Sequence, residues 1–309
     1  MENIRKTEKV SVIGLGQMGL KLAALLTEAN KEVTVWNRSL SKAVSLARVT
    51  VARSPEEAIS ASPVTVLCVY DNPAVWEILK QTGDGSVLKG KTLINFTTGS
   101  PSENDDLEGW MTANGAAYLN GAIQSAPDQM GLPGTTILFA GEEQAYNNCL
   151  HTLKIFGGNS KYLGARASLS SAMDLATLSW LYGSFVGLIY GSAICESSGL
   201  NLTLYHDLIA ETTPGITEFL KHEINVIRQK DYQVSQSPLA ISVSATQRIL
   251  DAVKSFGLDS RFPENIALLL KEAQEQGLEN SEIASLIGVI GPRRDADLQD
   301  RAWARPANS

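Results

Sequence analysis

The sequence predicts an α/β protein in which a domain built on a parallel-type sheet is followed by an all-helical domain. Short apolar segments rich in β-branched residues alternate with helical segments from Lys9 to about Leu163. This alternation is typical of a parallel sheet with helices on both faces. The strand pattern stops near residue 165, and apolar residues then recur at helical spacing to about residue 290. We therefore place a domain boundary near residue 165.

The first domain is expected to span residues 1–166. Strands are expected over residues 10–13, 32–36, 64–70, 92–96, 117–119, 136–140 and 161–163. Helices are expected between them, over residues 17–28, 40–47, 55–60, 73–80, 102–114 and 142–156. These assignments rest on the periodicity of the apolar residues and on helix start and stop signals.

The second domain is expected to span residues 167–291 and to be entirely helical. It begins with a long interdomain helix over about 168–197, and further helices are expected over 201–211, 215–230, 238–256, 263–276 and 281–290. The interdomain helix carries no formal charge from Leu175 to Ile194, so we expect a second subunit to cover it in an interlocked homodimer. Residues 292–309 are rich in Arg, Asp and Pro and are expected to form a flexible tail.

A membrane span is the alternative interpretation of this uncharged helix. It is long enough to cross a bilayer, and Gly183, Gly187 and Gly191 stand at a spacing also found in packed membrane helices. Several serines and two tyrosines dilute it, however, and neither end carries a basic cluster. We therefore expect no membrane contact.

Composition favours a cytoplasmic protein that does not bind nucleic acid. Of 309 residues, 44% are hydrophobic and 19% charged, an ordinary balance for a globular chain. The net charge of −7 disfavours nucleic acid and acidic membrane surfaces as partners. The first six residues include three charged side chains and lack the apolar core of a signal peptide, and the three cysteines form no CxxC motif.

A glycine motif follows the first expected strand and opens the first helix. It consists of Gly14, Leu15, Gly16, Gln17, Met18 and Gly19, a GxGxxG in the context that a Rossmann dinucleotide site requires. Its glycines permit the tight turn, the close approach of a pyrophosphate and the packing of helix on strand, while the helix N-terminus favours the phosphates. The alternative is a glycine-rich turn that binds nothing.

The end of the second strand favours NADPH over NADH. NAD enzymes usually carry a carboxylate there for the ribose 2′-hydroxyl. This chain has Asn37, Arg38 and Ser39 instead, with Lys42 one helical turn later. These side chains offer charged and neutral donors to a 2′-phosphate. The alternative is that Arg38 and Lys42 are surface residues and Ser39 is a helix cap.

Further cofactor contacts are expected from two later strands. Val69 and Tyr70 stand at the end of one, and Asn95 and Thr97 at the end of the next. Open α/β sheets bind their ligands at the carboxyl ends of strands.

Longer segments resemble a known superfamily. Val12–Gly19 together with Val35–Ser39 resembles the β-hydroxyacid dehydrogenases, whereas Ile94–Pro101, Gly121–Pro127 and Ser170–Gly183 are similar to imine reductases. The combination of Asn95, Asp174 and Tyr182 is similar to the reductive aminase subgroup. The resemblance covers about residues 9–290. It implies an NADPH-dependent oxidoreductase that transfers hydride to a C=N bond.

Asp174 is the residue on which this interpretation depends. Hydroxyacid dehydrogenases of the superfamily use a lysine near the start of the interdomain helix, but residues 166–188 contain none. A carboxylate there suits a cationic substrate: it can stabilise an iminium ion and, if burial raises its pKa, deliver the proton that forms one. The alternative is that Asp174 only caps the helix.

Tyr182 and Asn95 complete the expected catalytic set. Tyr182 lies about two helical turns beyond Asp174, so both side chains can border one cavity, and its hydroxyl can orient an amine nitrogen. Asn95 can hold a carbonyl oxygen or the nicotinamide ribose. The alternatives are a packing tyrosine and a turn-forming asparagine.

The expected substrate is a small imine, or a carbonyl compound plus an amine. The site is expected between the Rossmann domain of one subunit and the helical domain of its partner. Its pocket residues are expected to be Ser125, Met130, Leu178, Ile216 and Phe219. Two other functions stay open: an NADPH-dependent β-hydroxyacid or carbonyl reductase, and an NADPH-binding regulator without turnover.

No metal site is expected. The three histidines lie far apart in the sequence, and Glu218 and His222 have no evident third ligand. We interpret these two residues as a surface ion pair.

Overall fold

The computed structural model describes residues 8–291. The chain forms two compact units, Met1–Leu181 and Tyr182–Ser309, whose division falls within the long helix α6 (Ser168–Ser197). The domain boundary at residues 166 and 167 therefore stays a prediction. The flexible tail expected over residues 292–309 lies outside the described residues.

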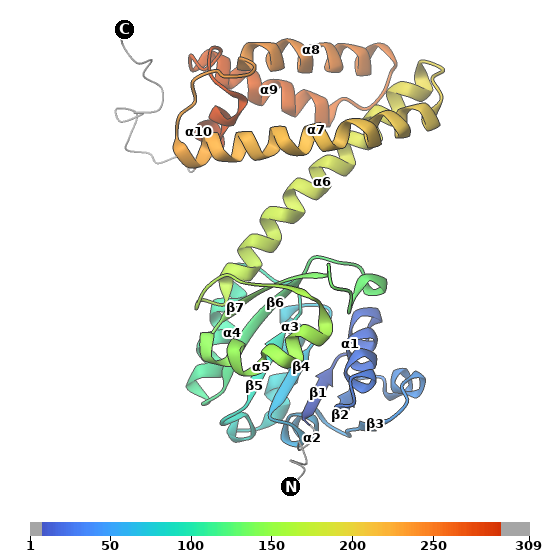
Figure 1. Cartoon of the computed structure of the whole chain (residues 1–309), viewed down its shortest axis with the longest axis vertical. Coiled ribbons are helices and arrows are strands. Elements are labelled where there is room, and N and C mark those ends of the chain that lie inside the picture. Colours follow the sequence, from blue (N-terminus) through green and yellow to red (C-terminus); the bar gives the residue numbers. More distant parts are fainter. Residues whose placement is uncertain (1–7, 292–309) are drawn as a thin grey trace. The chain divides into compact units, whose positions relative to one another are not determined.

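The first unit contains an eight-stranded sheet with the order β3-β2-β1-β4-β5-β6-β7-β8. Figure 1 labels the strands β1 to β7 of this sheet and the helices around it. The strands are β1 (Lys9–Ile13), β2 (Glu32–Trp36), β3 (Val49–Val51), β4 (Val64–Leu67), β5 (Thr92–Asn95), β6 (Ala117–Ile123), β7 (Thr136–Gly141) and β8 (Asn159–Tyr162). Neighbouring strands are parallel except for β6 and β7, which are antiparallel. The predicted α/β class with a parallel-type sheet is confirmed.

Helices cover both faces of this sheet because successive strand residues point to opposite sides. Val10 and Val12 lie in one apolar cluster with residues of α1 (Gln17–Glu28) and α5 (Glu143–Phe156). Ile13 lies in the other, which includes residues of α2 (Pro55–Ala61), α3 (Asn72–Leu79) and α4 (Pro101–Ala113). Two cores thus hold the strand ends in place.

Several expectations for this unit were wrong in detail, among them the strand over 64–70, which ends at Leu67. The short strand β3 was not predicted, and the segment expected as an α-helix over 40–47 is a 3₁₀ helix, η1 (Leu40–Ser45). Strand β6 continues to Ile123, where it pairs with Ile137 of β7. Cross-strand pairing decides these lengths, and local sequence reports it poorly.

The second unit is helical, as predicted. After α6 it contains α7 (Leu202–Gln229), α8 (Leu239–Ser255), α9 (Arg261–Glu275), the 3₁₀ turn η5 (Ile283–Leu286) and α10 (Ile287–Ile290). Leu239 of α8 packs in a core with Leu270, Ala273 and Leu278. The expected break between residues 211 and 215 is absent: α7 continues through Pro214, although a proline removes one backbone donor and crowds the carbonyl of the preceding turn.

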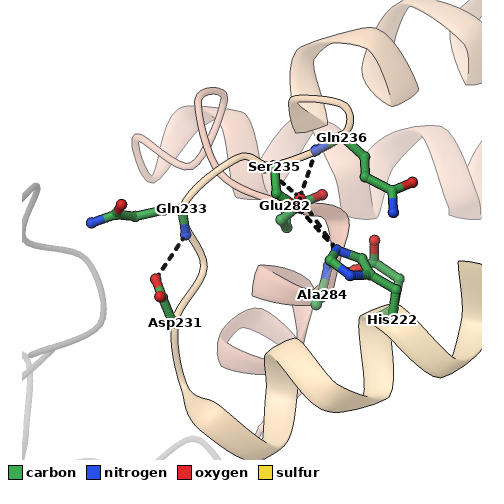
Figure 2. Close-up of polar contacts among 8 residues, drawn as sticks. His222, Asp231, Gln233, Ser235, Gln236, Glu282 and Ala284 are labelled. Atoms are coloured by element: carbon green, nitrogen blue, oxygen red, sulfur yellow. Dashed lines mark hydrogen bonds and ion pairs between the residues drawn. The ribbon is translucent and has the colours of Figure 1, made fainter.

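Buried carboxylates anchor the loop that follows α7 (Figure 2). Oε1 of the fully buried Glu282 accepts hydrogen bonds from the backbone N–H of Ser235 (2.7 Å) and of Gln236 (3.1 Å). His222 Nε2 lies 3.5 Å from the same oxygen, and Glu223 Oε2 accepts a bond from the Ala284 N–H (3.0 Å).

The expected ion pair between Glu218 and His222 was therefore wrong. Glu218 pairs with Lys221 at 2.6 Å. His222 lies beside two other residues: the side-chain atoms with which His222, Glu223 and Glu282 could bind a metal ion, one from each residue, lie within 4.8 Å of one another. Only tertiary packing brings Glu282 to this place.

Helix α6 is the one helix among residues 8–291 that is long and apolar enough to cross a membrane. Only 6% of its most apolar stretch is buried within the chain. Ile189 and Phe185 are examples of its exposed apolar side chains. The helix therefore presents an apolar surface that a single chain does not cover.

Candidate active site

The three glycines of the motif differ in what an added Cβ atom would meet. Gly14 has a φ of +98°, and a Cβ there would lie 2.2 Å from the Cys68 carbonyl oxygen. A Cβ on Gly19 would lie 2.0 Å from the Gly14 carbonyl oxygen, whereas one on Gly16 would meet nothing within 4 Å. Gly14 and Gly19 are therefore required by the fold, and Gly16 faces open space.

A groove of about 710 Å³ opens over this turn. Its lining includes the predicted residues Gly14, Leu15, Gly16, Gln17, Met18, Gly19, Asn37, Arg38, Ser39, Lys42, Val69 and Tyr70. Helix α1 begins beside it at Gln17, and its N-cap Gly16 has no side chain to occupy the first backbone N–H groups. The groove thus offers a diphosphate the donors of a helix N-terminus.

The end of β2 fits a 2′-phosphate. Arg38, Ser39 and Lys42 all line the groove, and Ser39 makes no capping hydrogen bond to η1. Asn37 connects two parts of the backbone, since its Oδ1 accepts a bond from the Leu15 N–H (2.9 Å) and its Nδ2 donates to the Ser39 carbonyl (3.0 Å). It ties the glycine turn to the strand end, where two cations and a hydroxyl face the groove.

A second cavity of about 290 Å³ adjoins the groove, because Met18, Cys68 and Val69 line both. Asp174, Leu178 and Thr97 are among its other lining residues. The cavity is formed by strand ends and by the first turns of α6. A dinucleotide that lies in the groove can therefore extend its reactive end toward Asp174.

Asp174 is half-buried and held by a side-chain amide. Gln124 Nε2 donates to its Oδ1 at 2.6 Å, and Thr177 Oγ1 donates to Gln124 Oε1 at 2.7 Å. Burial raises the pKa of Asp174 above its ordinary value, although the bond from Gln124 opposes this shift. The carboxyl group is thus positioned both to hold a cation and to exchange a proton.

The sequence of the chain matches two known domain families and a characterised relative. Residues 9–164 match the NAD binding domain of 6-phosphogluconate dehydrogenase, and residues 167–292 match the NADPH-dependent reductive aminase-like C-terminal domain. The chain is 29% identical to the NADPH-dependent reductive aminase of Aspergillus oryzae, over 94% of this chain and all of that protein.

Similar solved structures come from proteins of the same kind. The reductive aminase from Aspergillus terreus, in complex with NADPH4, cyclohexanone and allyl amine, is 32% identical over 93% of this chain and all of its own, with a TM-score of 0.85. An imine reductase from Pseudomonas sp. is 28% identical over the same shares, with a TM-score of 0.86. The chain belongs to the imine reductase and reductive aminase family. The predicted resemblance and NADPH as the cofactor are thereby confirmed.

The catalytic set expected of this reductive aminase-like chain is only partly brought together. Asn95 is fully buried: its Nδ2 donates to Asn72 Oδ1 (3.1 Å) and to the Tyr118 hydroxyl (2.9 Å), and its Oδ1 accepts a bond from the Thr97 N–H (3.0 Å). It lines neither cavity. Tyr182 belongs to the second unit and is 63% exposed.

The five expected pocket residues also differ in their placement. Leu178 lines the cavity with Asp174, whereas the half-buried Ser125 does not. Met130 is 2% exposed and packs in the core with α1 and α5, out of reach of a substrate. Ile216 and Phe219 are exposed on α7 in the second unit.

Sequence analysis missed several polar residues around the site. Ser171 lines the cavity, and Gln124 holds Asp174. A signal for Ser171 was present: Ser171, Asp174 and Leu178 stand at spacings of three and four, which place them on one face of a helix. Gln124 lies in the segment Gly121–Pro127 that resembles imine reductases, but no local pattern indicated its contact with Asp174, since β6 and α6 meet only in the folded unit.

Proposed function

We propose that this chain reduces C=N bonds by hydride transfer from NADPH, with Asp174 as the group that pairs with the iminium form of the substrate. The supporting observation is the cavity that adjoins the cofactor groove. Asp174 is the only ionisable carboxyl group among its described lining residues, and these include no lysine or arginine. A β-hydroxyacid needs a cation for its carboxylate; an iminium ion needs an anion.

NADPH supplies the hydride when it is bound; the residues of the chain supply position and charge. The carboxylate of Asp174 stabilises the positive charge of the iminium, and its half-burial strengthens that attraction relative to water. Gln124 and Thr177 hold the carboxylate in one orientation. Arg38, Ser39 and Lys42 bind the 2′-phosphate, and the N-terminus of α1 binds the diphosphate.

Reductive amination is the proposed extension of this activity. The A. terreus structure contains a ketone together with an amine, so a related protein accommodates both partners. In this chain, Asp174 is suited to accept a proton from an entering ammonium ion and to return it later. Coupling of a ketone or aldehyde with a small amine therefore belongs to the proposed function.

A homodimer with a shared site is also proposed, in the cytoplasm and without membrane contact. The apolar side chains of α6 that a single chain leaves exposed are then covered by a second copy. Tyr182, Ile216 and Phe219, which are exposed in one chain, are proposed to complete the site of the partner. Light scattering after size exclusion tests this: Ile189→Asp is expected to shift the protein from dimer to monomer, and a monomeric wild type contradicts the proposal.

The activity is tested by NADPH oxidation. A cyclic imine, cyclohexanone with a small primary amine, and NADP⁺ with a panel of β-hydroxyacids are assayed side by side. Turnover of the imine without turnover of the hydroxyacids is expected. Hydroxyacid oxidation as the main activity supports the dehydrogenase alternative, and tight NADPH binding without any turnover supports the regulator alternative.

A further inference from the structure

The cavity beside Asp174 contains a second polar side chain, Ser171, one turn earlier on α6. Ser171 lines the cavity although it is only 3% exposed. Asn104 Nδ2 lies 2.8 Å and Asn120 Nδ2 lies 2.6 Å from its Oγ, and both donate to it. A hydroxyl has two acceptor lone pairs and one proton. Both lone pairs are thus in use, and the proton is left to donate into the cavity.

The orientation of both amides follows from neighbours that can only accept. Asn104 Nδ2 also donates to the Ser100 carbonyl oxygen (3.1 Å), and Asn120 Nδ2 to the Ala167 carbonyl oxygen (3.3 Å). Exchanging nitrogen and oxygen in either amide would set two oxygens against each other. Ser171 therefore receives N–H groups from both sides.

A directed chain of hydrogen bonds reaches Asn104 from the sheet. The Thr97 N–H donates to Asn95 Oδ1 (3.0 Å), Asn95 Nδ2 donates to the Tyr118 hydroxyl (2.9 Å), and this hydroxyl donates to Asn104 Oδ1 (2.8 Å). A backbone N–H can only donate, so every bond runs toward Ser171. Burial raises the pKa of Tyr118 above its ordinary value, so its hydroxyl keeps its proton. Bonds arranged head to tail strengthen one another.

We propose that the Ser171 hydroxyl donates a hydrogen bond to the substrate oxygen during reductive amination. It binds first the carbonyl oxygen of the ketone or aldehyde and then the hydroxyl oxygen of the carbinolamine. This inference rests on the proposed function and deepens it. Asp174 faces the nitrogen as an acceptor, and Ser171 supplies the donor that an oxygen needs. Asn95 is then a positioning residue that acts through Tyr118 and Asn104.

The step balances without any further reagent. Asp174 takes one proton from the entering ammonium ion. The amine nitrogen then attacks the carbonyl carbon, the π electrons move to the oxygen, and one nitrogen proton moves to that oxygen. Asp174 returns its proton to the hydroxyl, the C–O bond breaks, and water leaves with the electron pair. An iminium ion remains, paired with the Asp174 carboxylate. Ser171 keeps its proton and stabilises the charge that passes over the oxygen.

The test compares two reactions of the full-length protein. One is NADPH oxidation with cyclohexanone plus a small primary amine; the other is the reduction of a preformed cyclic imine, which has no oxygen to hold. Ser171→Ala is expected to lower kcat/KM for the ketone–amine pair by about 10- to 100-fold, the effect of one lost hydrogen bond to a developing charge. The cyclic imine is expected to change by less than about threefold.

Matched variants separate this role from a structural one. Ser170 is the adjacent buried serine; its single hydroxyl proton faces the carbonyl oxygens of Asn120 and Ala167, each 3.1 Å from its Oγ, and it does not line the cavity. Ser170→Ala is expected to leave the ratio of the two activities unchanged. Ser171→Thr and Ser171→Val form a second pair of equal shape, of which only the threonine retains a hydroxyl. This pair gives the same comparison if the alanine variant does not fold.

The outcomes are distinct. An equal loss in both reactions, or a higher KM for NADPH with an unchanged ratio, overturns the inference, because the hydroxyl then serves the fold or the cofactor. A wild type that reduces the cyclic imine while Ser171→Ala affects both reactions alike overturns the inference alone. A wild type that reduces neither substrate overturns the proposed function and the inference together.

Discussion

Gln124 Nε2 donates a hydrogen bond of 2.6 Å to Oδ1 of Asp174. Gln124 stands just beyond the end of β6 and Asp174 on α6, and Thr177 Oγ1 in turn donates to Gln124 Oε1. A carboxylate can only accept, so the amide nitrogen of Gln124 is the end that faces Asp174. The proposed catalytic carboxylate therefore has a defined position before any substrate enters.

Replacing Asp174 with asparagine tests this carboxylate directly. Asp174→Asn keeps the size of the side chain and removes its charge, so kcat for cyclic imine reduction is expected to fall by about 10²- to 10⁴-fold. The folded-state pKa of Asp174 is raised, so its contribution to stability is lost as the pH rises through that pKa. The variant is therefore expected to unfold at no lower temperature than the wild type at pH 7. Activity within about threefold of the wild type would falsify the assignment.

Removing Gln124 is expected to change the pH profile. The bond from Gln124 lowers the pKa of Asp174, and burial raises it. In Gln124→Leu only burial acts, so the pKa rises further. Because the carboxylate is the form that pairs with an iminium, the acidic limb of kcat/KM for a cyclic imine should move to higher pH. Gln144→Leu is the control, since Gln144 bonds Asn148 on the surface. An unmoved limb contradicts the proposed contact.

Alanine substitutions at two glycines of the same motif are expected to have different effects, one on stability and one on NADPH binding. Gly19→Ala sets a Cβ 2.0 Å from the Gly14 carbonyl oxygen and should lower the free energy of unfolding by about 1–3 kcal/mol. Gly16→Ala meets no protein atom within 4 Å, so it should fold normally and weaken NADPH binding by about tenfold or more. Thermal unfolding and NADPH titration check both. Normal NADPH affinity in Gly16→Ala contradicts the proposed path of the diphosphate.

Arg38 is expected to carry the preference for NADPH. Arg38→Ala removes a charged donor from the end of β2 and should weaken NADPH binding by roughly 10- to 100-fold, the value of a hydrogen bond to a charged group. NADH has no 2′-phosphate, so its affinity should hardly change. Arg53→Ala replaces an exposed arginine that does not line the groove and serves as the control. Equal losses of affinity for NADPH and NADH would mean that Arg38 binds a part of the dinucleotide other than the 2′-phosphate.

Glu223 is expected to destabilise the second unit as the pH rises. Burial and the nearby Glu282 raise its pKa. A group with a raised folded-state pKa contributes stability below its unfolded pKa and loses it as the pH passes the folded value. Glu223→Gln cannot ionise and still accepts from the Ala284 N–H, so its melting temperature should exceed that of the wild type more at pH 8 than at pH 5. Glu218→Gln, an exposed change, should differ little at either pH. A gain that is independent of pH contradicts this account.

The cofactor half of the site could be predicted from the sequence because its signals are local. The turn from Gly14 to Gly19 follows from glycine's freedom and from the strand before it. The cations at Arg38 and Lys42 follow from their place at a strand end. The length of α6 follows from an unbroken apolar helical pattern, and its bounds, Ser168–Ser197, were predicted closely.

Tertiary structure alone decided which polar groups meet around the substrate. Asn95 stands at the predicted strand end, yet its amide nitrogen donates to Tyr118 and Asn72 and the residue does not line the cavity. Ser171 gains its role only because Asn104 and Asn120, from α4 and β6, converge on it. Periodicity and turn chemistry report the preferences of a few neighbouring residues. Hydrogen-bond partners far apart in the chain are chosen by how the helices pack on the sheet, which no local pattern encodes.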